Sequence, residues 1–267
     1  MKRFWQLSIA ITLLACGQAA SAGGASAVAE PLSLAAAPSL KAPFEEILPI
    51  FEVEYGVPLR VQYGPSYTLR RQIEQGAPID VFLPESWQDV ETLHQKGLTR
   101  LGGPRQYAQS SLVLVMSSAS AATAISFSEA SAKGALRVAL VDPKASSVGL
   151  IAFRALKDIA PLLQHRPHFL SAPSTDDVIR LVSAGEADVG VVYRADAINS
   201  GQVRIIDEAP AGRSIPVVFG QTVVSTCRET SLPAAEQFVN FMMSPRIQKL
   251  LLKYGFDAIP TKATTVG

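Results

Sequence analysis

Over residues 32–256 the chain alternates short apolar runs with segments whose apolar residues recur every three or four positions. The first run is Leu32–Ala36, and the segment after it places Phe44, Ile47 and Phe51 on one helical face. A helix between two strands is the crossover that parallel strands require. The pattern therefore predicts an α/β fold with parallel sheets.

The alternation forms two sets of strands and helices, followed by a helical tail, without internal repeats or low-complexity linkers. After the first strand we expect strands over 57–63, 79–83, 112–115, 136–141, 189–193, 203–206 and 215–224, the last of them broken at Gly220. This order predicts two lobes, one formed by residues 31–112 with 218–267 and the other by 113–217. In open α/β sheets ligands bind beyond the carboxyl ends of the strands. We therefore expect the functional site at the strand-to-helix junctions that face the other lobe.

Composition excludes two classes of partner. The 267 residues include 24 Lys and Arg against 23 Asp and Glu, a formal net charge of +1. A nucleic-acid-binding protein needs a basic surface, so we expect no nucleic-acid partner. No stretch approaches the ~20 consecutive apolar residues that span a bilayer.

The first 30 residues are predicted to be a signal peptide and a tether. A basic start precedes the short apolar run Leu7–Ala15, a layout typical of secretory signals. The sequence Leu-Leu-Ala-Cys-Gly around Cys16 resembles a bacterial lipobox, which would lipidate Cys16; a rival cleavage site follows residues 20–22. Both readings predict a periplasmic or cell-envelope protein, which contacts the membrane only if Cys16 carries a lipid anchor.

Two serines occupy corresponding junctions. Ser39 follows the first expected strand and Ser66 follows the second, each at the start of a helix. One interpretation is that both are N-caps, whose hydroxyls accept hydrogen bonds from their own helices. The other is that both bind an anion, because a helix start offers free N–H groups and the positive end of the helix dipole.

Several motifs extend this pattern along the chain. They are Ser39-Leu40 with 44–47, the run 68–82, the segment 111–115, Asp142-Pro143 with Gly149, the run 185–193 with 195–197, and Ser244-Pro245 with 253–256. In this order they resemble the periplasmic molybdate-binding proteins of ABC importers. The resemblance implies a type II periplasmic binding fold, in which two α/β lobes joined by two crossovers close on a tetrahedral oxyanion.

The resemblance also implies a set of ligand-binding residues. Hydroxyl and amide groups would come from Ser39 and Ser66, main-chain amides from Val148 and Thr175, and a hydroxyl from Tyr193. Neutral donors from several helix starts would then surround the dianion without an ion pair. Alternatively, Tyr193 packs its ring in the core and hydrogen-bonds a neighbouring loop.

Four positions depart from that family. Pro38, Pro65, Tyr67 and Val148 stand where it usually has small residues. The two prolines lack an N–H, and the two larger side chains add bulk near the expected pocket. Molybdate or tungstate is the expected ligand, with another oxyanion or a small organic anion as the alternative.

We expect a carrier, and not an enzyme. The chain has no G-x-S-x-G nucleophile motif, and its last histidine is His168, which leaves the final third without a candidate base. His165 and His168 are separated by Pro167 and lack flanking ligands, so no protein-bound metal and no cofactor are expected. The expected partner is the permease of an ABC transporter, with a periplasmic sensor or accessory role as the alternative. A monomer is expected.

Overall fold

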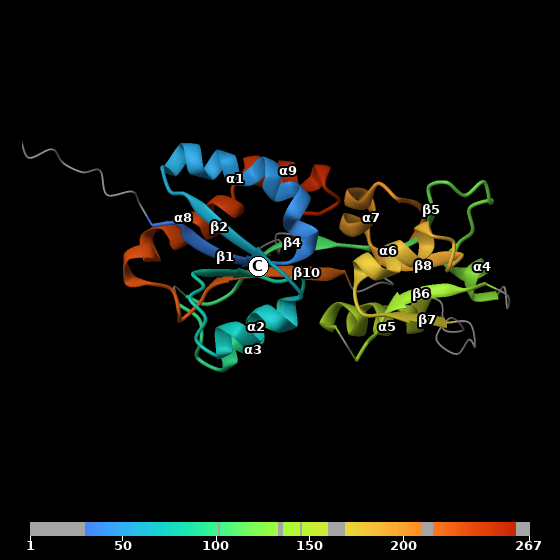
Figure 1. The fold of residues 1–267 in the computed structure, drawn as a ribbon, viewed down its shortest axis with the longest axis horizontal. Helices are drawn as coiled ribbons and strands as arrows, with labels where there is room; N and C mark the ends of the chain where they lie inside the picture. The colour runs from blue at the N-terminus through green and yellow to red at the C-terminus, as the bar shows by residue number, and fades with distance from the viewer. Residues whose placement is uncertain are drawn as a thin grey trace, which may run out of the picture.

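The computed structural model describes residues 30–100, 102–132, 136–144, 146–159, 169–209 and 216–259. These residues form two mixed sheets in two lobes that lie side by side (Figure 1). The first sheet has the strand order β2-β1-β3-β10-β4, and the second has the order β7-β6-β8-β5-β9. Helices cover both faces of each sheet, which confirms the predicted α/β class.

The first lobe joins the beginning and the end of the chain. Its strands are β1 (Leu32–Ala36), β2 (Leu59–Tyr63), β3 (Val81–Leu83), β4 (Arg105–Ser110) and β10 (Val217–Val223). Its helices are η1 (Pro38–Leu40), α1 (Lys41–Tyr55), α2 (Ser66–Glu74), α3 (Trp87–Gln95), η3 (Glu229–Ser231), α8 (Leu232–Met242) and α9 (Pro245–Lys253). Strand β1 is parallel to β2 and β3, so the helices that follow these three strands begin at one edge of the sheet.

The second lobe repeats this arrangement. Its strands are β5 (Leu112–Ser117), β6 (Val138–Val141), β7 (Phe169–Ala172), β8 (Val189–Tyr193) and β9 (Val203–Glu208). Its helices are α4 (Phe127–Ala132), α5 (Ser147–Ile159), α6 (Thr175–Ser183) and α7 (Arg194–Ser200). Strand β6 is parallel to β7 and β8, so α5, α6 and α7 also begin at one edge.

Some elements differ from the sequence-based expectation. Strand β4 was not expected, because most of its residues are polar; its pairing with β10 makes it a strand. The sequence-based expectation also did not include strand β7, helix α4 or helix α7. Gly220 does not break β10; the register shifts between Phe219 and Gly220, as in a β-bulge. An added Cβ at Gly220 would lie 2.5 Å from Cγ2 of Val90 on α3, so glycine allows this helix to approach the strand.

Side chains also join the lobes near the crossover from β4 to β5. The hydroxyl of Ser110, which is fully buried, donates to the Gly255 carbonyl at 3.2 Å and accepts from the Ala195 N–H at 3.2 Å. The Asn199 amide donates to the Tyr254 carbonyl. Helix α7 of the second lobe is therefore anchored to the segment that follows α9 in the first.

Several predictions fall outside the described residues. They concern the signal peptide and tether up to residue 29, lipidation of Cys16, and the pair His165 and His168. Within the part of the chain that the structure describes, no helix has both the length and the apolar composition needed to cross a bilayer.

Candidate functional site: an interlobe cleft

The carboxyl ends of the parallel strands of both sheets border a cleft between the lobes. Helix starts line it because each of these strands is followed by a helix. The first lobe contributes Pro38, Pro65, Ser66, Tyr67, Glu85 and Asp89, and the second contributes Ser146, Pro173, Ser174, Thr175, Asp176 and Asp196. Such helix starts present unpaired N–H groups and favour anions.

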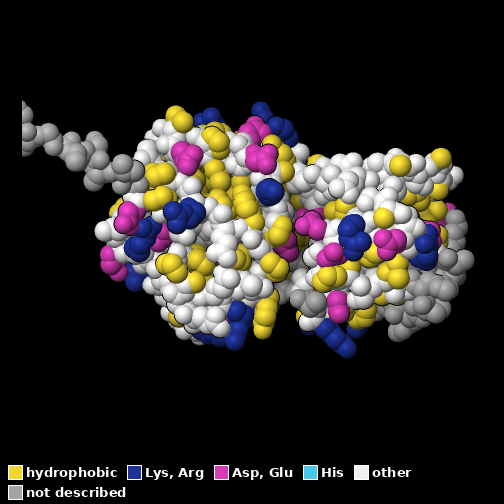
Figure 2. Space-filling model, in the orientation of Figure 1, with side chains coloured by type: hydrophobic (Ala, Val, Ile, Leu, Met, Phe, Trp, Pro, Cys, Tyr) yellow, Lys and Arg dark blue, Asp and Glu magenta, His cyan; other side chains and the backbone are white. Residues whose placement is uncertain are grey.

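The cleft continues toward α1 in a second hollow. Pro38, Asp176 and Asp196 line both parts, and the second part adds Ser39, Lys41, Ala42, Glu45, Asn199 and Ser200. On the face drawn in Figure 2, acidic side chains gather at the junction between the lobes.

The two serines lie where the junction pattern predicted, and neither caps its helix through its side chain. The Oγ of Ser39, a residue only 7% exposed, has no hydrogen-bond partner among the described residues. The Oγ of Ser66 accepts the Glu85 N–H at 3.0 Å, so it links the starts of α2 and α3. The N-cap interpretation is thus wrong for both, and Ser39 retains a buried, unused donor beside the cleft.

The second lobe places its predicted residues less uniformly. Thr175 lines the cleft as the first residue of α6, behind the N-cap Ser174, whose hydroxyl accepts the Asp177 N–H at 3.2 Å. Val148 lies in the first turn of α5, and its side chain is outside the described residues.

Tyr193 ends β8 and is 2% exposed, so its ring lies behind the cleft wall. Burial raises the pKa of its hydroxyl well above the usual value, and the nearby carboxylates of Asp196 and Glu85 add to the shift. The hydroxyl therefore stays protonated near neutral pH and can act as a donor.

Three of the four departures from the resembled family line the cleft. Pro38 and Pro65 stand at the starts of η1 and α2, where they contribute no N–H. Tyr67 is 56% exposed, and its ring packs 5.1 Å from the Arg70 guanidinium. These side chains shape the entrance of the cleft on the first-lobe side.

The sequence reasoning missed an acidic group on the cleft wall. Glu85 follows β3, Asp176 lies in the first turn of α6, and Asp196 lies in the first turn of α7. Burial raises the pKa of Glu85 to about 7, helped by the negative charges of Asp176 and Asp89. Burial, Glu85 and Asp176 likewise raise the pKa of Asp196 well above its usual value. The sequence signal for these carboxyl groups is their position just after strand ends, at or near the junctions that contain the predicted donors.

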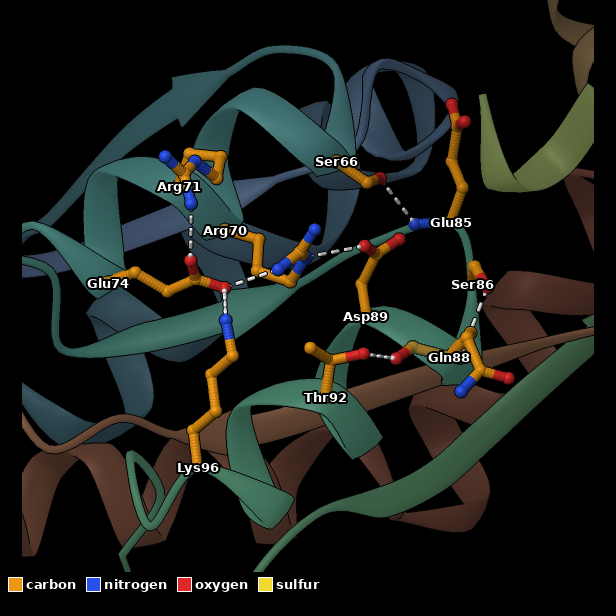
Figure 3. A network of polar contacts seen from close by, with 10 residues as sticks. All are labelled: Ser66, Arg70, Arg71, Glu74, Glu85, Ser86, Gln88, Asp89, Thr92 and Lys96. Carbon is orange, nitrogen blue, oxygen red and sulfur yellow. Dashed lines mark hydrogen bonds and ion pairs between the residues drawn. The ribbon is translucent and has the colours of Figure 1, made fainter. Parts of the chain in front are cut away.

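The arginines of α2 do not line the cleft, and the pairing of Arg70 reaches only Asp89 among the cleft carboxylates. Arg70 forms ion pairs with Glu74 and with Asp89, the latter at 3.1 Å from Nε to Oδ1, and Lys96 joins Glu74 at 2.9 Å (Figure 3). The side chain of Arg70 is only 12% exposed, so these ion pairs are largely buried on the Arg70 side. In Figure 3 the Glu85 carboxylate extends away from this network.

A metal centre is not supported by the geometry. Among the residues that the structure describes, no three His, Cys, Asp or Glu side chains are arranged to hold a metal ion. The cleft is thus lined by helix starts, hydroxyls and separated carboxyl groups.

Comparison with known proteins shows the family of this chain. Residues 32–257 match the profile of the bacterial extracellular solute-binding proteins. The chain belongs to this family. It is therefore a solute-binding protein and not an enzyme, as the missing nucleophile motif predicted.

Several relatives of this chain are molybdate-binding proteins. The molybdate-binding protein ModA of Escherichia coli is 28% identical over 89% of this chain and 93% of its own length. A putative ABC transporter substrate-binding lipoprotein of Bacillus subtilis, YvgL, is 27% identical over 85% of this chain and 86% of its own. The predicted resemblance is confirmed.

The fold agrees with solved structures. The periplasmic molybdate-binding protein of Azotobacter vinelandii superposes with a TM-score of 0.73, at 24% identity, over 86% of this chain and all of that one. The fold is thus the type II periplasmic binding fold that the resemblance implied.

Proposed function

We propose that this protein captures a tetrahedral oxyanion, molybdate or tungstate, in the interlobe cleft and delivers it to the permease of an ABC importer. The observation that carries the proposal is the buried hydroxyl of Ser39, which has no hydrogen-bond partner in the described part of the chain and lies beside a cleft where helix starts from two lobes meet. The molybdate-binding relatives support the choice of anion.

In this proposal the ligand is bound by Ser39 and Ser66 from one lobe and by Val148, Thr175 and Tyr193 from the other. The proposed lobes are residues 31–112 with 218–267, and 113–217, which differ by one residue from the strand bounds at each crossover, where β5 begins at Leu112 and β10 at Val217. Donors on both sides would let one small anion hold the lobes together. The protein would act as an exported monomer, soluble in the periplasm or anchored through a lipid on Cys16.

A second candidate is another oxyanion or a small organic anion. The proline and tyrosine side chains at Pro38, Pro65 and Tyr67 favour it, because they change the donors and the shape of the entrance. A sensor or accessory protein would use the same cleft.

Titration calorimetry of the purified protein with molybdate, tungstate, sulfate and phosphate tests the proposal. We expect one site per chain, with molybdate and tungstate bound more tightly than sulfate or phosphate. Moderate salt should change the affinity little, since buried interactions are weakly screened. Absence of heat with all four would overturn the ligand class, and tighter binding of sulfate would overturn the preference for the larger anions.

Uptake in cells tests the transport role. Deletion of the gene should reduce molybdate accumulation at limiting concentration, and the intact gene should restore it. Normal accumulation in the deletion strain, with anion binding intact, would favour the sensor or accessory role.

A further inference from the structure

The acidic residues of the cleft raise a physical problem for any anion. Glu85, Asp176 and Asp196 line the same hollow as Ser66 and Thr175, two of the five proposed oxyanion donors. Among the described residues, no hydrogen bond or ion pair to the carboxylates of Glu85 and Asp196 is present, and Arg70 is held by Glu74 and Asp89. A dianion placed here would be repelled by each ionised carboxylate.

Neutral carboxyl groups remove this repulsion and supply donors. A protonated carboxyl has one O–H that can donate to an anion oxygen, whereas the ionised form only accepts. The buried and unpartnered hydroxyl of Ser39 lies in the same cleft, where it lines the hollow with Asp176 and Asp196. The cleft thus combines an unused donor with acids that become donors when they bind a proton.

Resting on the proposed function, we propose that oxyanion capture is coupled to proton uptake, with Glu85 and Asp196 neutral in the complex. Glu85 is the principal switch, because it lines the cleft with its carboxylate directed away from Arg70, and burial with the charges of Asp176 and Asp89 raises its pKa to about 7. Burial and the negative charges of Glu85 and Asp176 also raise the pKa of Asp196 well above its usual value, which favours its neutral form.

The surroundings of Glu85 are dominated by groups that disfavour its ionised form. The titratable and charged groups that face it or share its cleft are Tyr107 of β4, Asp89 of α3, Asp176 of α6, Tyr193 of β8, Asp196 of α7, and Lys41 and Glu45 of α1 in the adjoining hollow. Arg70 of α2 approaches through its pair with Asp89. Lys41 is the single cation that lines either part of the cleft among the described residues.

The sign of the pH dependence follows. Below about pH 7 Glu85 is protonated before the anion arrives, and above it a proton must be taken up. One linked proton weakens binding by about tenfold between pH 6 and pH 8, since the affinity changes with the number of protons bound. Molybdate and sulfate are suitable probes because they remain fully ionised dianions over this range.

The experiment is calorimetric titration of the full chain with molybdate at pH 6, 7 and 8, in buffers of different ionisation enthalpy. We expect uptake of about one proton per bound anion at pH 8 and a tenfold weaker affinity there than at pH 6. Glu85→Gln keeps a neutral side chain that can donate, so it should bind at pH 8 as tightly as the wild type at pH 6, without that proton uptake.

Asp196→Asn provides a second variant, which should retain binding at pH 6. Glu91→Gln is the matched control: it carries the same substitution on α3, where Glu91 accepts from Gln95 outside the cleft, and it should keep the wild-type pH dependence. Equal wild-type affinity at pH 6 and 8 without proton uptake would overturn the inference while leaving the proposed function intact. Loss of binding in Glu85→Gln at every pH, with Glu91→Gln normal, would also overturn it. No binding by the wild type at any pH would overturn both.

Discussion

At the residue scale, Ser39 and Ser66 have the same place in sequence and different roles in the structure. The hydroxyl of Ser66 already accepts a hydrogen bond from a backbone N–H, whereas that of Ser39 is buried with no partner among the residues placed by the structure. A buried hydroxyl without a hydrogen bond costs stability, and a bound anion would remove that cost. Substitution of Ser39 should therefore affect anion affinity without loss of stability, whereas substitution of Ser66 should affect both.

Alanine substitution at each serine tests this difference. Ser39→Ala should weaken molybdate binding by roughly tenfold to more than a hundredfold, equivalent to a lost charged hydrogen bond of about 1.5–3 kcal/mol. Its free energy of unfolding should stay the same or rise, because an unsatisfied group is removed. Ser66→Ala should lose both affinity and about 0.5–1.5 kcal/mol of stability. Calorimetry and urea unfolding measure the two quantities, and wild-type affinity in both variants would exclude these serines from the site.

At the element scale, the position of α5 depends on one glycine. An added Cβ at Gly149 would lie 2.7 Å from the carbonyl oxygen of Asp142 and 2.9 Å from that of Val141, both backbone atoms. Glycine thus lets the first turn of α5 approach the end of β6. The proposed amide donor at Val148 belongs to the same turn.

Gly149→Ala should displace that turn. We expect a loss of about 1–3 kcal/mol of stability, typical of overpacking, together with weaker anion binding. Gly103→Ala is a matched control, since its φ of 86° and the His94 ring at 2.9 Å disfavour a Cβ in a loop that does not line the cleft. The control should lose stability and keep affinity. Unchanged affinity in Gly149→Ala would remove α5 from the binding site.

At the scale of the whole molecule, the site requires both lobes. Residues of the cleft come from six strand-to-helix junctions, three in each lobe, and Ser110 lies at a crossover between the sheets. A small anion that contacts donors on both sides favours the closed arrangement, because it binds that arrangement more tightly.

Small-angle X-ray scattering tests this closure. Saturating molybdate should reduce the radius of gyration, and Ser39→Ala should show the same reduction only at higher molybdate concentration. An unchanged radius at saturation, with binding verified by calorimetry, would contradict closure around the ligand.

Local patterns were sufficient for the α/β class, for most strands and helices, and for the junctions at Ser39, Ser66 and Thr175, because periodicity and the order of elements are local properties. The resemblance of the chain's motifs to those of known proteins identified the family. Only the tertiary structure showed that Ser39 lacks a partner and that Ser66 binds the Glu85 backbone, since both depend on contacts distant in sequence. It also brought Glu85, Asp176 and Asp196 to one cleft from three separate helix starts. The effect of these carboxylates on one another's pKa depends on their distances in the folded protein, which no local sequence pattern encodes.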